Sequence, residues 1–152
     1  KGNGTISGVE TWKGMVNDMG KTFIRVKGII KKDDRYLLVK RWVDDHIPEP
    51  FIWEFIDTEV NHGEAPDEAV LRAIQELLSI DGRIEKIEYT WSNMLGDTHC
   101  VGIAYICSIP EDEEKHIILP EEYGEYEWVK REEFEDYIEN QFVLQDLKDK
   151  TL

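Results

Sequence analysis

Apolar runs near the start of the chain predict strands. Residues 22–30 (TFIRVKGII) and 35–42 (RYLLVKRW) are rich in β-branched and apolar side chains, and the polar run KKDD between them is typical of a hairpin turn. Residues 44–50 contain two prolines, which favours a loop. Residues 51–55 (FIWEF) predict a short strand. We therefore expect strands alone before the first helix.

The residues after Gly63 have the apolar spacing of an α-helix. Pro66 suits a first helical turn, and Asp67 and Glu68 suit the positive end of a helix dipole. The apolar positions follow the spacing of one buried helix face: Val70, Leu71, Ile74, Leu77 and Leu78. The run ends at SIDG, where Gly82 predicts a left-handed cap.

The second half of the chain predicts more strands and a last helix. Residues 83–91 (RIEKIEYTW) and 99–109 (HCVGIAYICSI) predict two strands joined by SNMLGDT, and EYEWVK predicts a final one. EDEEKH predicts an acidic loop, and REEFEDYI opens a C-terminal helix that is able to continue through FVLQDL. The order strands, helix, strands, helix predicts an α/β fold with a mixed β-sheet and helices on its faces.

Charge and cysteine content narrow the classes of function. The 152 residues include 33 acidic and 18 basic ones, for a formal net charge of −15. Such a field repels phosphate backbones, so no nucleic-acid partner is expected, and no apolar run is long enough to span a membrane. Cys100 and Cys107, on one predicted strand, would lie about 23 Å apart on opposite faces and cannot pair. Free thiols without a signal peptide favour a cytoplasmic location.

Arg72 and Glu76 lie four residues apart on the side of the predicted helix opposite the apolar stripe. The plain interpretation is an amphipathic helix with one exposed ion pair, worth about 0.3 kcal/mol. Periodicity alone favours this interpretation. The neighbouring residues add a second one.

The segment around this helix resembles the box of the Nudix hydrolase family, which includes the MutT-like proteins. That box reads Gly, five residues, Glu, seven residues, then Arg-Glu-hydrophobic-any-Glu-Glu-any-Gly-hydrophobic. The matching positions here are Glu64, Arg72, Ile74, Glu76 and Ile80. The departures are Thr58 and Ser79 in place of Gly, and Ala73 and Leu77 in place of Glu. The motif is therefore degenerate.

Two flanking segments extend the resemblance. Residues 53–58 (WEFIDT) are similar to the Trp-Glu-Phe-Pro-Gly-Gly run that precedes the box in many members, and residues 122–134 (EYGEYEWVKREEF) are similar to the Glu-x-x-Glu-x-x-Trp-Val stretch before their last helix. The resemblance implies a Nudix-type α/β/α sandwich with a mixed β-sheet. We expect one such domain at residues 22–152, after an N-terminal extension at residues 1–21.

Nudix enzymes cleave a nucleoside diphosphate linked to another group, and divalent ions offset the phosphate charge and activate the attacking water. The resemblance implies that Arg72 and Glu76 are catalytic and that Glu76 binds Mg²⁺ or Mn²⁺. It places a backbone carbonyl ligand at Asp57, whose own carboxylate is a further metal-ligand candidate. Glu64 has a structural role in the family.

Several residues outside the box are further candidates. Arg41, at a strand end, is a candidate phosphate contact, and Trp53 is a candidate for packing against a base. Their plain alternatives are a surface charge and a core aromatic. Acidic residues at 111–114 and 121–122 are candidates for a base outside the box, against the plain interpretation of a solvated loop.

Two functions follow from these residues. One is a metal-dependent hydrolase of a nucleoside diphosphate-linked small molecule, weak or atypical because one carboxylate and one carbonyl hold Mg²⁺ or Mn²⁺ poorly. The alternative is a non-catalytic nucleotide-binding or regulatory module on the same scaffold. Both imply a small nucleotide-type ligand, and the resemblance adds a homodimer as an expected assembly. A prenyl diphosphate isomerase on this scaffold needs a Cys facing its substrate, and neither Cys lies in a matching segment.

Overall fold

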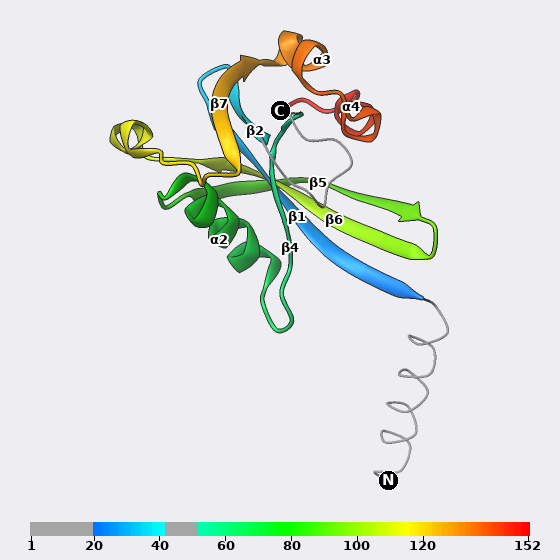
Figure 1. The fold of residues 1–152 in the computed structure, drawn as a ribbon. Coiled ribbons are helices and arrows are strands. Elements are labelled where there is room, and N and C mark those ends of the chain that lie inside the picture. The colour runs from blue at the N-terminus through cyan, green and yellow to red at the C-terminus, as the bar shows by residue number, and fades with distance from the viewer. Residues whose placement is uncertain (1–19, 42–51) are drawn as a thin grey trace.

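The computed structural model describes residues 20–41 and 52–152, and it contains strands before and after one long helix (Figure 1). Its elements are β1 (Lys21–Lys32), β2 (Arg35–Arg41), β3 (Trp53–Glu54), β4 (Ile56–Glu59), α2 (Pro66–Leu78), β5 (Arg83–Leu95), β6 (Thr98–Ser108), the 3₁₀ turn η1 (Glu111–His116), β7 (Tyr123–Lys130), the 3₁₀ turn η2 (Arg131–Glu133), α3 (Phe134–Tyr137) and α4 (Gln141–Leu147). The expected loop at 44–50 lies outside the described residues.

The strands form one mixed sheet, which confirms the predicted α/β class. Its order is β3-β2-β1-β6-β5, with β4 also paired to β1 and β7 to β2. β1 runs parallel to β6, and the other pairs are antiparallel. In the β1–β4 register, Arg25 lies opposite Glu59 and Lys27 lies opposite Asp57.

Helices cover both faces of this sheet, as expected for a sandwich. α2 packs on one face, against a buried cluster that includes Val26 and Ile30 of β1. α3 and α4 lie on the other face, against a cluster that includes Ile29 (Figure 1). β1 alternates between the two cores because successive strand residues point to opposite faces. Each fully buried aliphatic side chain stabilises the folded state by roughly 1.5–3 kcal/mol relative to an exposed one.

Gly28 lets α2 approach β1 closely. A Cβ atom at this position would lie 3.1 Å from Val70 Cγ2 of the helix. A side chain at this position would therefore require Val70 or α2 to shift by a few tenths of an ångström. This contact fixes the height of the helix above β1 and β4, which carry the candidate site.

The end of α2 differs from its prediction. The left-handed residue is Ser79, with φ of 61°, and not Gly82. Gly82 is needed for a different reason, because a Cβ atom there would lie 2.8 Å from Ile74 Cδ1. The glycine marks tight packing beside the helix, and the cap lies three residues earlier.

Other predicted boundaries also need correction. SNMLGDT is not a loop: β5 continues to Leu95, β6 begins at Thr98, and only Gly96 and Asp97 form the turn. Of the described residues in FIWEF, only Trp53 and Glu54 form a strand, β3, and β4 begins after this run, at Ile56. EDEEKH forms a 3₁₀ turn. The C-terminal helix is interrupted at residues 138–140, so α3 and α4 are separate.

The two cysteines are both free and lie on β6, as expected. Cys107 is buried in the cluster beneath α2, and Cys100 is half-buried. Within residues 20–41 and 52–152, no helix has the length and apolar character needed to cross a membrane.

Candidate functional site

A cleft of about 480 Å³ lies beside α2. Its walls come from β1, β2, β4, α2 and the segment leading into β7. The lining residues are Arg25, Arg41, Ile56, Asp57, Thr58, Glu59, Ala73, Glu76, Leu77, Pro120, Glu122 and Tyr123. The cleft therefore contains two of the residues expected to bind metal, Glu76 and Asp57.

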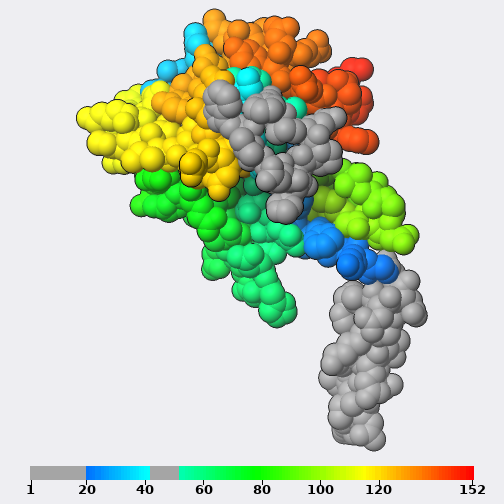
Figure 2. Space-filling model, in the orientation of Figure 1, coloured from blue at the N-terminus to red at the C-terminus, as the bar shows by residue number. Residues whose placement is uncertain are grey.

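Two hydrogen bonds attach one wall of the cleft to the end of α2. The Ile118 amide donates to the Leu78 carbonyl at 3.0 Å, and Ser79 Oγ donates to the Ile118 carbonyl at 3.2 Å. The space-filling view shows the segment before β7 (yellow) lying directly on α2 (green) (Figure 2). Pro120, Glu122 and Tyr123 follow this attachment point and line the cleft.

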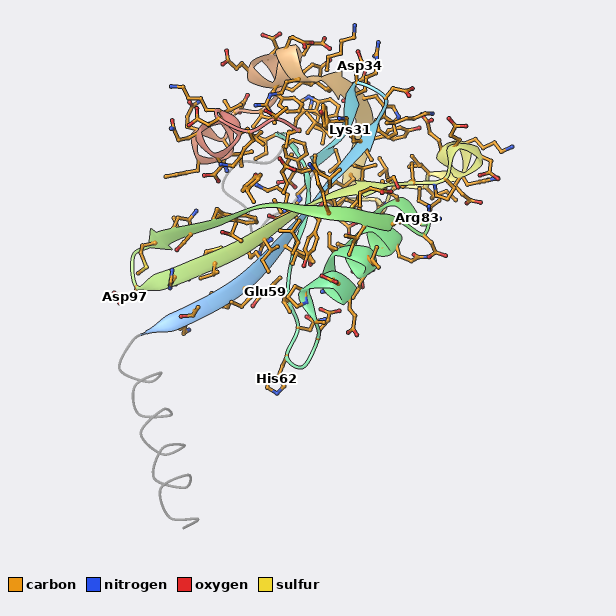
Figure 3. All side chains as sticks on the ribbon, turned by 180° about the vertical axis from the view of Figure 1, so that it is seen from behind. Lys31, Asp34, Glu59, His62, Arg83 and Asp97 are labelled. Atoms are coloured by element: carbon orange, nitrogen blue, oxygen red, sulfur yellow. The ribbon has the colours of Figure 1, made fainter. Side chains whose placement is uncertain are left out.

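Arg72 connects α2 to the loop that precedes it. Its Nε and Nη2 donate to the two carboxylate oxygens of Glu64 at 2.8 and 3.0 Å, and Nη2 also donates to the Glu59 carbonyl at 2.9 Å. These bonds hold the pKa of Glu64 below its usual value, with the Arg72 hydrogen bond as the largest cause. Figure 3 shows Glu59 close to the start of α2, whereas His62 at the loop tip points away from the body.

Glu76 points into the cleft. Its side chain is 67% exposed, and one of its oxygens lies 3.4 Å from Arg72 Nη1. This is the ion pair that the sequence predicts. Arg72 itself does not line the cleft, so it orients Glu76 and the preceding loop from behind.

Asp57 already has a cation as its partner. Arg25 donates from Nε to Asp57 Oδ1 at 3.0 Å, and Arg25 Nη2 contacts the same oxygen. Both side chains are partly exposed and line the cleft. The Arg25 guanidinium group occupies Oδ1 and offsets the charge of the carboxylate, so Asp57 is a poorer ligand for a metal ion.

Arg41 lies at the end of β2, across the cleft from α2. Its Nη2 is 3.2 Å from Glu54 Oε1 and donates to the Tyr123 hydroxyl at 2.6 Å. Burial raises the pKa of Glu54, and Arg41 opposes this shift. Arg41 therefore brings a second guanidinium group into the cleft, next to the Tyr123 hydroxyl.

The model of the NUDIX domain family matches residues 22–147. The chain belongs to the Nudix family. No individual curated protein matches the sequence significantly.

Several solved structures have the same fold. A NUDIX hydrolase from Nitrosomonas europaea gives a TM-score of 0.69 at 16% identity, over 85% of this chain and 88% of that one. A MutT protein from Methanosarcina mazei Go1 gives 0.66 at 21% identity, over 87% and 98%. The E. coli ORF135 protein gives 0.66 at 18% identity, over 87% and 94%. At these identities the likeness concerns the fold.

The two Nudix-box positions that carry Ala73 and Leu77 remain on the cleft wall without a carboxylate. Ala73 is only 6% exposed, and Leu77 packs partly against the buried cluster beneath the helix. Across residues 20–41 and 52–152, no three or more His, Cys, Asp or Glu side chains are grouped so as to hold a metal ion. These residues therefore do not fit a divalent ion held by protein ligands.

Trp53, the candidate for packing against the base of a nucleotide, lies away from the cleft beside α2. Its ring packs edge-on against Tyr137, with centroids 5.5 Å apart, and Lys40 Nζ lies 5.6 Å from its centroid. It does not line the cleft and packs against the cluster under α3 and α4. This placement is that of a core aromatic.

The acidic residues outside the box divide into two groups. Glu122 lines the cleft, so it lies where a base outside the box would be needed. Glu114, which lies in η1, is paired with Lys32 of β1 and does not line the cleft. Only the second acidic segment thus reaches the site.

Arg25 and Tyr123 are cleft residues that we did not single out from the sequence. A signal for Arg25 exists, because Arg25 and Lys27 are cations two residues apart in an apolar strand, and this spacing places them on one face. Tyr123 gave no such signal, because its position depends on how the segment before β7 docks onto α2.

Proposed function

We propose that this Nudix protein binds a small nucleotide-type ligand in the cleft beside α2, without efficient metal-dependent hydrolysis. The observation that carries the proposal is the helix wall of the cleft, where Ala73 and Leu77 leave Glu76 as the single carboxylate. The pairing of Asp57 with Arg25 supports the same conclusion. The Nudix fold is present, but Ala73 and Leu77 lack the carboxylates that the box has at these positions.

Efficient hydrolysis by the mechanism of the family would need the helix carboxylates that are absent at Ala73 and Leu77. Mg²⁺ prefers octahedral oxygen coordination and is usually bound through one or two carboxylates together with the substrate phosphates. Glu76 is the one carboxylate that α2 offers here. If the missing ligands weaken transition-state binding by about 4 kcal/mol, the rate falls roughly a thousandfold.

The class of ligand follows from size and chemistry. The cleft volume of about 480 Å³ lies in the range of small-molecule pockets. Arg25 and Arg41 suit the oxygens of a phosphate or diphosphate group, because guanidinium groups form charge-assisted hydrogen bonds with them. The net charge of −15 disfavours a nucleic acid as the partner.

Calorimetry of the full chain with a panel of nucleotides and nucleotide sugars tests this proposal. Titrations in EDTA are compared with titrations in Mg²⁺ or Mn²⁺, and product is measured by chromatography. We expect binding in EDTA and no product at an ordinary enzymatic rate. Metal-dependent turnover at an ordinary rate would overturn the proposal, as would the absence of binding to the whole panel.

A weak hydrolase is the second candidate, and one observation favours it. Glu76 is exposed in the cleft and still oriented by Arg72. If purified protein shows slow turnover with Mn²⁺, Glu76→Gln should abolish it. Glu127→Gln, at an exposed position on β7 with the same change of charge, is the matched control. Unchanged turnover in Glu76→Gln would place the reaction elsewhere.

Three broader expectations remain proposals: a homodimer, a cytoplasmic location, and a domain at 22–152 that follows an extension at 1–21. Light scattering in solution tests the dimer. Removal of residues 1–21 tests the boundary, since thermal stability should remain unchanged if they lie outside the domain.

A further inference from the structure

Arg25 presents its guanidinium group to the cleft in a fixed orientation. Nε and Nη2 are held by Asp57, and Nη1 makes no hydrogen bond with any residue in 20–41 or 52–152. Strand pairing fixes both partners, since β1 and β4 are hydrogen-bonded at these residues. An arginine oriented in this way loses little side-chain entropy when an anion binds.

The same face of β1 carries a second cation, Lys27, which does not line the cleft. Lys27 lies two residues from Arg25 and opposite Asp57 in the strand register, and it is only 5% exposed. It forms no hydrogen bond or ion pair with a described residue, and its Nζ lies 4.5 Å from the Trp91 ring centroid. Burial lowers the pKa of Lys27, and Asp57 opposes this shift. Asp57 thus lies near both Arg25 and Lys27 of β1.

We infer that Arg25 takes the place of the divalent ion of this site, so that the cleft binds a diphosphate group without metal. The inference rests on the proposed function and identifies how that function is achieved. The resident guanidinium group supplies, next to Asp57, positive charge of the kind that a bound metal ion would supply. Asp57 is then a positioning residue for Arg25 and not a metal ligand.

Binding of inorganic pyrophosphate to the full chain in EDTA tests this inference by calorimetry. Arg25→Gln should weaken binding by at least about tenfold, because the guanidinium charge and the charge-assisted hydrogen bond from Nη1 are lost. Arg25→Lys should weaken it less, because the charge remains and the fork is lost. The control is Arg35→Gln, an exposed arginine at the opposite end of β2 from Arg41, next to the hairpin marked by Asp34 in Figure 3. The Arg35→Gln variant should bind pyrophosphate with the affinity of the wild type.

Asp57→Asn separates the arginine site from a metal site. The amide oxygen of the substituted side chain would still accept a hydrogen bond from Arg25, but the side chain would no longer neutralise the guanidinium charge. Pyrophosphate binding in EDTA should therefore stay equal or become tighter. Loss of binding in Asp57→Asn, together with a requirement for Mn²⁺ in the wild type, would identify Asp57 as a metal ligand and overturn the inference.

The outcomes distinguish this inference from the proposed function. If nucleotides bind in EDTA but Arg25→Gln retains full affinity for pyrophosphate, the proposed function stands and the role of Arg25 is refuted. If nothing binds without metal, both fail. Circular dichroism checks the fold of each variant, and the rise in melting temperature caused by pyrophosphate gives a second measure of affinity.

Discussion

The loop-facing and cleft-facing sides of α2 belong to the same 13-residue helix but differ in what the family pattern retains. On the loop side, Arg72 and Glu64 keep the hydrogen bonds that hold the preceding segment. On the cleft side, Ala73 and Leu77 replace carboxylates. The helix in this chain therefore has two separate sides, one that builds the junction with the preceding loop and one that faces the cleft.

The largest effect is expected when Glu is introduced at both cleft-side positions of the box, in the double variant Ala73→Glu and Leu77→Glu. We expect a loss of about 3 kcal/mol in the free energy of unfolding, because Ala73 is buried and Leu77 packs against the core. Mn²⁺ affinity, measured by calorimetry, should rise. The same double variant with Gln at both positions is the control, and equal Mn²⁺ binding by the two would contradict the prediction.

Removal of the loop-side network should have the next largest effect. Arg72→Ala loses the paired contacts to Glu64 and the bond to the Glu59 carbonyl, so the free energy of unfolding should fall by about 2 kcal/mol. Urea unfolding measures this change. Glu76→Gln, which loses only an exposed ion pair, should cost less than about 0.5 kcal/mol. Equal losses in the two variants would show that the two sides are not separable.

The helix cap offers a change in the opposite direction. Ser79 has a φ of 61°, a conformation that glycine adopts without strain. Ser79→Gly should therefore raise the free energy of unfolding by about 0.5 kcal/mol, despite the loss of the bond to Ile118. Ser79→Ala loses the same bond without relieving strain and should be less stable than wild type in thermal melts. A Gly variant no more stable than the Ala variant would refute this explanation.

The smallest expected effect is on the acid side of the stability profile. Because the hydrogen bond from Arg72 holds the folded-state pKa of Glu64 below its usual value of 4.5, the contribution of Glu64 to stability is complete above about pH 4.5 and is lost as the pH falls through the folded pKa. Glu64→Gln should therefore reduce the fall in melting temperature on acidification from about pH 5 to about pH 3. Glu127→Gln on β7 is the control, and identical profiles for the two variants would contradict the prediction.

Local patterns predicted much of the fold. The β1–β2 hairpin, the start of α2 at Pro66 and the last strand follow from residue type and spacing. The cap at Ser79 and the role of Gly82 could not be predicted in this way. They depend on Ile118 and Ile74, which reach these positions only through tertiary packing.

The candidate site was predictable to a smaller extent, for the same reason. The Arg72–Glu76 pair is local, and its spacing predicted it correctly. The Arg25–Asp57 pair joins residues 32 positions apart, and it exists because β1 and β4 pair in one particular register. Strand register is a property of the assembled sheet. Sequence patterns therefore identified Asp57 as a candidate but did not predict that Arg25 pairs with it.

The reciprocal hydrogen bonds between Ile118 and the end of α2 have a mechanical consequence. They clamp the approach to β7 onto the helix, so displacement of that cleft wall would require the last helical turn to fray. A bound molecule that spans from Arg25 on the sheet to Glu122 on the clamped wall would therefore suppress that fraying. Its presence would be recorded as slower amide exchange near Leu78, a residue that it need not touch.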